Sequence, residues 1–182
     1  MESPFPPGDP RIDRFNQLSH QASELSRNLA LLHDRSLPVM GFFARRRARK
    51  AIALYKQCIE IFPGSWQSHW LKGKLHQVLN EHAHASAAFD EAARINPTQP
   101  DVLREAAISA ADIHDYEKSL RYAAAASAAA PDDAGLVANL ALAQSQCGRH
   151  VQAIATAEQA CRMDPADEIN QNVLKHVKSK AR

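Results

Sequence analysis

Residues 85–97 read ASAAFDEAARINP, and the proline at the end of this stretch belongs to a series with a constant spacing of 34 residues. Small residues stand twelve and five positions ahead of each proline, and in the first two periods an aromatic residue, Tyr55 or Phe89, stands between them. The prolines are Pro63, Pro97, Pro131 and Pro165, and the small residues are Ala51, Ala85, Ser119 and Ala153, then Cys58, Ala92, Ala126 and Ala160. A repeat of this length is typical of stacked helical hairpins.

Apolar residues inside each period return at helical intervals. In residues 66–99 they are Leu71, Leu75, Val78 and Leu79, followed by Ala85, Ala88, Phe89 and Ala92. This spacing predicts two amphipathic helices per period. Short oxygen-bearing side chains just before the predicted helices are expected N-caps, namely Ser65, Thr98, Asp133 and Asp167. Because no stretch alternates with period two, we expect an all-α fold without a sheet.

This pattern resembles the tetratricopeptide repeat family, whose units carry Gly or Ala at position 8, Ala at 20, an aromatic residue at 24, Ala at 27 and Pro at 32. Three complete units fit, at residues 66–99, 100–133 and 134–167, and residues 37–65 fit a degenerate first repeat with a basic segment. The resemblance implies a right-handed α-solenoid of antiparallel helix pairs. In the later units position 24 is occupied by the small residues Ala123 and Ala157. A thinner, alanine-rich core is therefore expected there.

The two ends of the chain differ from the repeats. Residues 1–10 are rich in proline and are expected to be flexible. Residues 11–36 are predicted to form an amphipathic helix with an apolar stripe of Phe15, Leu18, Ala22, Leu25, Leu29 and Leu32. The stripe is expected either to cap the first repeat or to form a homodimer through residues 12–32. Residues 168–182 are expected to form a C-terminal capping helix and tail.

The composition argues against a general affinity for polyanions. Acidic and basic residues nearly balance, with 20 Asp and Glu against 22 Lys and Arg, and they are mixed along most of the chain. The three cysteines have no C-x-x-C spacing, which argues against a disulfide framework. We find neither a signal-peptide pattern nor an apolar run long enough to span a bilayer, and we therefore expect a cytoplasmic location.

Residues 42–50, FFARRRARK, join two aromatic residues to a run of bases. The bases, called the basic segment below, are Arg45, Arg46, Arg47, Arg49 and Lys50. Next to exposed aromatic rings they can bind an anionic membrane surface or nucleic-acid phosphates. The favoured interpretation is that Phe42 and Phe43 pack beneath the first helix and the bases form a solvated face. A basic site for an acidic protein is a third interpretation.

The sequence offers no catalytic constellation. It contains no phosphate-binding glycine loop, no dinucleotide fingerprint and no G-x-S-x-G elbow. Among nine histidines, the best metal candidates are the pairs His82 with His84 and His69 with His76. Neither pair has a third ligand at suitable spacing, whereas zinc sites need three or four donors. We therefore expect no metal, no cofactor and no enzymatic activity in this chain.

A binding surface remains, and the resemblance indicates where it lies. In tetratricopeptide proteins the first helix of each unit lines a concave groove, with positions 2, 5, 9, 12 and 13 directed into it. The corresponding residues are Gln67, Trp70, Lys74, Gln77 and Val78, then Asp101, Arg104, Ile108, Ala111 and Asp112, then Gly135, Ala138, Leu142, Ser145 and Gln146. The resemblance thus implies a non-catalytic adaptor or scaffold that binds a protein or peptide segment in this groove.

Narrower assignments within the family remain open. The clamp that co-chaperones use for acidic chaperone tails needs Lys, Asn and Arg at defined positions, where this chain has Trp70, Lys74, Glu105, Gly135 and Asn139. That clamp is absent. The length and the helical arm before the repeats resemble small secretion chaperones of the same family, and the chain can also be the repeat portion of a larger enzyme.

Overall fold

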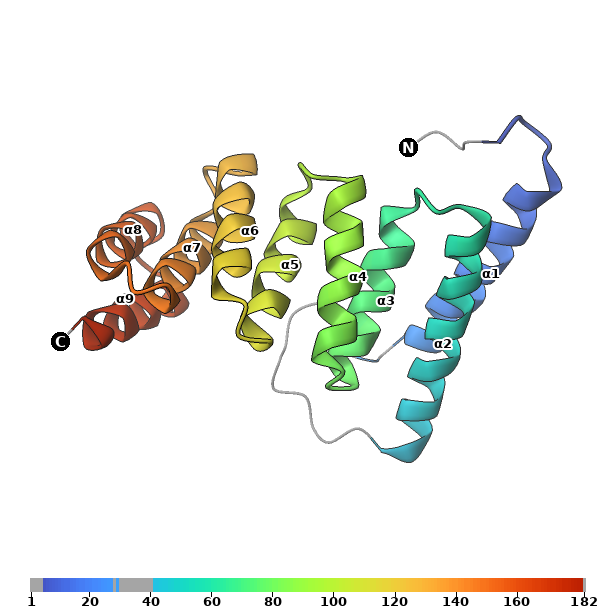
Figure 1. Ribbon diagram of the computed structural model, residues 1–182, viewed down its shortest axis with the longest axis horizontal. Coiled ribbons are helices and arrows are strands. Elements are labelled where there is room, and N and C mark those ends of the chain that lie inside the picture. The colour runs from blue at the N-terminus through green and yellow to red at the C-terminus, as the bar shows by residue number, and fades with distance from the viewer. Residues whose placement is uncertain (1–4, 28, 30–40, 182) are drawn as a thin grey trace. The chain divides into compact units, whose positions relative to one another are not determined.

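The computed structural model describes residues 5–27, 29 and 41–181. Within these residues it contains nine helices and no strand, which confirms the all-α prediction (Figure 1). The helices are α1 (Pro10–Ser26), α2 (Phe42–Ile61), α3 (Trp66–Val78), α4 (His82–Ile95), α5 (Pro100–Asp112), α6 (Tyr116–Ala129), α7 (Ala134–Gln146), α8 (His150–Met163) and α9 (Glu168–Lys180). The chain forms two compact units, unit 1 at Met1–Ile95 and unit 2 at Asn96–Arg182.

Helix α1 buries its apolar face in unit 1. It packs against α2, and Leu18 and Ala22 lie in one core cluster with Ala51 and Tyr55. The helix ends at Ser26, earlier than the predicted span of 11–36, and residues 28 and 30–40 lie outside the described part of the chain. The sequence did not decide whether this apolar stripe caps the first repeat or forms a homodimer. In the described residues the stripe packs against α2.

The segment before α1 also makes tertiary contacts from Phe5 onward. The Phe5 ring lies edge-on to Phe62, with 6.4 Å between ring centres, and the Arg11 guanidinium lies 4.1 Å above the Phe5 ring. The side chain of Asp9 accepts from the backbone N–H of Arg11 and caps α1. Aromatic packing and a helix cap thus link Phe5, Asp9 and Arg11 to the rest of unit 1, and the flexibility of residues 1–10 stays a prediction.

Tyr55 and Cys58 fill the space between α1 and α2. Both side chains are buried, and burial raises the pKa of Tyr55 to about 12 and that of Cys58 to about 11. The Cys58 thiol also donates weakly to the carbonyl of Phe15, at 3.9 Å. A thiol with so high a pKa is neutral at physiological pH, so Cys58 is a packing residue and not a nucleophile.

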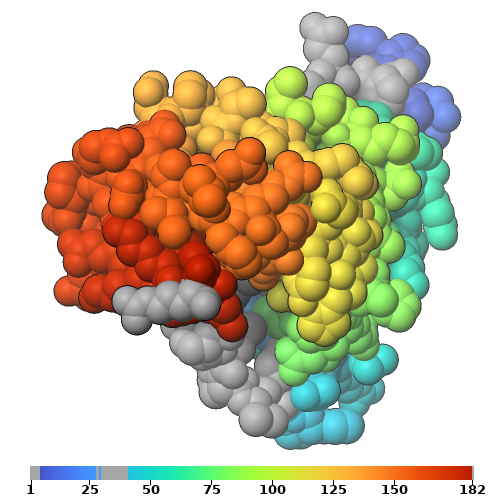
Figure 2. Space-filling view, turned by 60° about the vertical axis from the view of Figure 1, so that its left-hand side comes forward, coloured from blue at the N-terminus to red at the C-terminus, as the bar shows by residue number. Residues whose placement is uncertain are grey.

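Unit 2 has the alanine-rich core that the sequence predicts. Ala153, Ala157 and Ala160 of α8 are fully buried, and they pack with Val173 and Val177 of α9. Figure 2 shows α7, α8 and α9 gathered together, in orange to red. Lys178 of α9 forms an ion pair with Glu158 of α8 at 2.9 Å. Helix α9 therefore packs on both α7 and α8.

Three of the four predicted N-caps are confirmed. The side chains of Ser65, Asp133 and Asp167 accept backbone N–H groups at the starts of α3, α7 and α9. Thr98 was wrong. The N-cap of α5 is Gln99, and its side chain makes no capping bond, because Pro100 is preorganised as the first helical residue and moves the cap one position along the chain.

One turn geometry joins the two helices of every complete repeat. The chain enters the left-handed region at Asn80 (φ 59°), His114 (φ 62°) and Gly148 (φ 73°). The next residue then donates its backbone N–H back to the first helix, in the pairs Glu81 to His76, Asp115 to Ala110 and Arg149 to Gln144, each at 2.9 Å. This is the Schellman arrangement, which satisfies the last carbonyls of a helix while the chain reverses.

Gly73 allows α3 to approach α4 closely. A Cβ at this position would lie 2.8 Å from the Phe89 ring, which is itself fully buried. We expect Gly73→Ala to lower the free energy of unfolding by about 1 kcal/mol, because overpacking outweighs the gain in helix propensity. Chemical denaturation of the purified variant measures this change.

The Phe89→Leu background provides the matched control. Leucine lacks the ring edge that a Cβ at position 73 would meet, so Gly73→Ala should be neutral or stabilising there. An equal effect of Gly73→Ala in both backgrounds would contradict the proposed clash.

Candidate functional site

The first exposed surface of interest lies on α3 in unit 1. Trp70 is half-buried, Gln67 is exposed, and Lys74 and Gln77 are half-buried. The Lys74 ammonium lies 6.0 Å from the centre of the Trp70 ring, at the outer limit of a cation–π contact. These four residues are called the α3 face below. The helix thus presents an aromatic ring with a cation above it and amides on either side.

The second surface lies on α5 and α7 in unit 2, whose helices contact each other. Arg104 is paired with Asp101 of its own helix at 2.8 Å, and Ile108 is half-buried one turn further along. The remaining residues of this surface, called the α5–α7 face below, are Ala111, Asp112, Leu142 and Gln146, all of them half-buried or exposed. The Arg104 guanidinium therefore already has an acidic partner on its own helix.

Three residues of the expected groove are not accessible. Ala138 is only 2% exposed and lies in the core cluster of unit 2. Val78 and Ser145 are buried as well. Family position numbers indicate an average direction along a helix, whereas in this chain these three side chains are buried. Gly135 is exposed but carries no side chain to contact a ligand.

The aromatic residues ahead of the basic segment are exposed. Phe42 is 73% and Phe43 77% exposed, so the favoured expectation that they pack beneath the first helix is wrong for the described structure. Their rings lie edge-on to each other at the start of α2, with 5.6 Å between centres. None of the described helices combines the length and apolarity that a membrane span requires.

Two members of the basic segment have structural roles. Arg47 donates to the carbonyls of Leu25 and Arg27 at 3.0 Å each, at the end of α1, where a cation offsets the helix dipole. Arg49 forms an ion pair with Glu81 at 3.2 Å. Arg46 and Lys50 are exposed. Part of this charge therefore serves to join helices and is not displayed to a partner.

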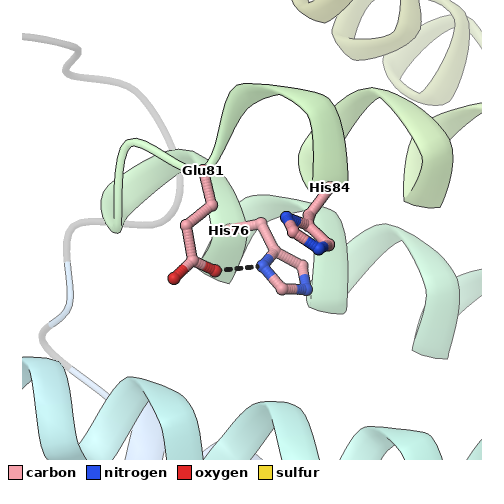
Figure 3. Close-up of side chains that lie close together, drawn as sticks. All are labelled: His76, Glu81 and His84. Carbon is pink, nitrogen blue, oxygen red and sulfur yellow. Dashed lines mark hydrogen bonds and ion pairs between the residues drawn. The ribbon is translucent and has the colours of Figure 1, made fainter.

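Three potential metal ligands meet where α3 turns into α4. His76, Glu81 and His84 each offer one donor atom, and these atoms lie within 4.8 Å of one another. Glu81 accepts from Nδ1 of His76 at 2.7 Å, and the two imidazole rings are stacked with centres 5.2 Å apart (Figure 3). The sequence pairs His82 with His84 and His69 with His76, but the structure brings His76 to His84. Sequence reasoning missed Glu81 because only the turn places it beside His76.

His69 is a buried histidine at the other end of α3. Its Nε2 lies 3.3 Å from the carbonyl oxygen of Pro63. Burial lowers the pKa of His69 below its ordinary value of 6.5, and the charge of Lys72 acts in the same direction. The ring is therefore expected to stay neutral in the folded protein near neutral pH.

This shift predicts a loss of stability in mild acid. The unfolded chain protonates His69 near its ordinary pKa, whereas the folded chain resists protonation, so the free energy of unfolding falls as pH drops through about 6.5. We expect His69→Gln to lose less stability than the native chain between pH 7.5 and 5.5, as measured by urea unfolding at each pH. His20→Gln, at an exposed position on α1, is the control. Equal pH dependence in all three proteins would contradict the prediction.

Comparisons with known proteins agree with the architecture. A sequence model described as tetratricopeptide repeat matches residues 40–100 and 104–168. A search of curated proteins finds no match.

Several solved structures share the fold. The chain is similar to MamA, residues 41 to the end, from Desulfovibrio magneticus RS-1, with a TM-score of 0.69 and 16% identity over 92% of this chain and 91% of that one. It is similar to YrrB, a protein with an unusual peptide-binding site, with a TM-score of 0.67 and 16% identity over 96% and 78% of the two chains. The first repeat domain of RPAP3, bound to the HSP90 peptide SRMEEVD, gives 0.57 and 12% over 63% and 90%. At such identities the likeness concerns the fold.

Proposed function

Because the chain belongs to the tetratricopeptide repeat family, we propose that it is a non-catalytic adaptor that binds a segment of a partner protein on the α3 face, the α5–α7 face, or both. The observation that carries this proposal is the exposed part of Trp70 with Lys74 beside it. Aromatic side chains with few rotatable bonds supply large contact areas at low entropic cost and are frequent anchors of interfaces.

The chemistry of the two faces favours a segment with apolar anchors over a strongly charged one. The α3 face carries one cation, Lys74, and the α5–α7 face carries Arg104 with the acids Asp101 and Asp112. A ligand carboxylate would have to displace Asp101 from Arg104, although an exposed pair of this kind contributes only about 0–1 kcal/mol. Ile108 and Leu142 offer half-buried aliphatic contacts. We therefore propose a peptide that carries both apolar and charged residues. The acidic tail of a large chaperone is not the proposed ligand, because this chain lacks the clamp residues that bind such tails.

The test is affinity capture from a lysate of the source organism, with retained proteins quantified by mass spectrometry. We expect at least one protein to be held by the native chain and reduced about tenfold or more by Trp70→Ala or Lys74→Glu, as for an anchor residue of an interface. Arg104→Glu tests the α5–α7 face in the same way. Circular dichroism must show that each variant remains folded.

Arg121→Glu is the matched control for Arg104→Glu. Arg121 is an exposed arginine on α6, the second helix of the same repeat, so this variant makes an identical charge change away from both faces. Partner lists that are the same for the native chain and all face variants would contradict the proposal and redirect attention to the basic segment.

A second candidate function is peripheral attachment to an anionic membrane. The observation in its favour is the exposure of Phe42 and Phe43 beside Arg46 and Lys50. Aromatic rings insert at the interface between headgroups and acyl chains, and each nearby cation contributes about 1 kcal/mol of salt-sensitive attraction. Binding of nucleic-acid phosphates through the same bases is less favoured, since phosphate contacts do not account for an exposed aromatic pair on a nearly neutral chain.

Vesicle sedimentation tests this second candidate. Binding to phosphatidylserine-containing vesicles should fall steeply between 50 and 300 mM salt and should be lost in the double variant Phe42→Ser, Phe43→Ser. Val151→Ser removes a comparably exposed apolar side chain, 85% accessible on α8, and should leave binding unchanged. No binding by the native chain, or equal loss in the Val151 variant, would refute membrane attachment, and stronger binding to an oligonucleotide would favour nucleic acid instead.

The remaining assignments stay predictions of the sequence. They are the homodimer through residues 12–32, the cytoplasmic location, the secretion-chaperone role and the repeat portion of a larger enzyme. The homodimer would need a surface other than the part of the α1 stripe that already packs on α2.

A further inference from the structure

The three donors at the α3–α4 turn are held by the fold on one side and open to solvent on the other. His76 is buried, Glu81 is half-buried and His84 is exposed. The buried imidazole is fixed by its bond to Glu81, whereas His84 sits on the first turn of α4 at the edge of the cluster (Figure 3). A cation entering from solvent would therefore meet one exposed donor, His84, and two donors that are already bonded to each other.

The backbone brings Glu81 to His76. Asn80 adopts φ 59°, and the N–H of Glu81 then donates to the carbonyl of His76 at 2.9 Å. This bond holds the two residues together even though five positions separate them in the sequence. His84 follows Glu81 by three positions, which places it on the same side of α4. The Schellman turn thus sets the spacing of the three donors.

The other repeats provide an internal comparison, because they form the same turn with different residues. The positions of His76, Glu81 and His84 are occupied by Ala110, Asp115 and Lys118 in the next repeat and by Gln144, Arg149 and Gln152 in the last. Both turns keep the backbone bond at 2.9 Å. The turn geometry therefore does not require two histidines and a glutamate at these positions, and this set of donors is specific to one repeat.

We propose that His76, Glu81 and His84 form a three-ligand site for a divalent first-row transition metal of the Zn²⁺ type. Two imidazole nitrogens and one carboxylate oxygen are a usual donor set for zinc with one position open, whereas Mg²⁺ and Ca²⁺ prefer oxygen ligands alone. Donors around a tetrahedral zinc ion lie about 3.3 Å apart. The present separation of at most 4.8 Å closes to that value when the exposed His84 side chain rotates inward and its ring leaves the stack.

The hydrogen bond between His76 and Glu81 marks the position of the cation. A metal replaces the proton that Nδ1 of His76 donates to Glu81, and that proton passes to solvent. The second carboxylate oxygen of Glu81 already accepts from Arg49 at 3.2 Å, so an outer partner orients the ligand as in established metal sites. The fourth coordination position remains for water or for a group from a binding partner.

Calorimetric titration of the purified full chain with ZnCl₂ tests the site. We expect one equivalent to bind the native chain, with affinity lowered about tenfold or more in His84→Ala and in Glu81→Gln, since even outer partners of metal ligands change affinity about 10–100-fold. Zinc should raise the thermal midpoint of the native chain and not that of His84→Ala, because a ligand that binds only the folded state stabilises it. Mg²⁺ in place of Zn²⁺ should give no such binding.

His82→Ala is the matched control, because His82 is an exposed histidine on the same turn of α4 and lies outside the cluster. It should bind zinc like the native chain. Absence of binding to the native chain, equal affinity in His84→Ala, or a loss in His82→Ala as large as in His84→Ala would each overturn the proposal. Should Glu81→Gln fail to fold, the exposed position of His84 leaves His84→Ala as the deciding variant.

Discussion

Small side chains between paired helices are the constraint on which the rest of the structure depends. In unit 1, Gly73 leaves the space that the buried Phe89 ring occupies, so one large residue can fill the gap between α3 and α4. In unit 2, the buried residues of α8 that pack in the core are Ala153, Ala157 and Ala160, and each contributes only a methyl group. Each alanine buries little area, and hydrophobic stabilisation scales with buried apolar area at about 25 cal/mol per Å². Unit 2 therefore depends on a further helix, α9, to complete its core.

Most of the architecture could be predicted from the sequence because it follows from local rules that repeat. Helices α3, α5, α7 and α9 begin at Trp66, Pro100, Ala134 and Glu168, the residues at which the 34-residue period starts a new segment. Proline spacing, small residues at fixed positions and short polar caps are all readable within one period. The same locality explains why the alanine-rich core was foreseeable, since the shrinking residues are visible one period apart.

The candidate sites were less predictable because they depend on contacts between segments. Ala138 occupies a family groove position, yet neighbouring helices cover it. Phe42 and Phe43 resemble core residues by composition, but their place at the first turn of α2 leaves them exposed. Glu81 appears in sequence as an ordinary turn residue, and only a backbone bond from its N–H to the His76 carbonyl brings it beside the imidazole. A signal was nevertheless present, because comparing equivalent positions of the three repeats isolates His76, Glu81 and His84 as a set that occurs once.

The recurring left-handed turn has a consequence for how such a chain can change over time. The turns at Asn80, His114 and Gly148 share one backbone geometry, so the same turn accommodates different side chains at equivalent positions. Each repeat therefore carries equivalent side-chain positions around its turn. Duplication of a repeat copies these positions together with the helices that hold them. A set of side chains that arises in one repeat can in this way recur at the equivalent positions of another. A repeat protein can therefore acquire new binding sites without a change of fold.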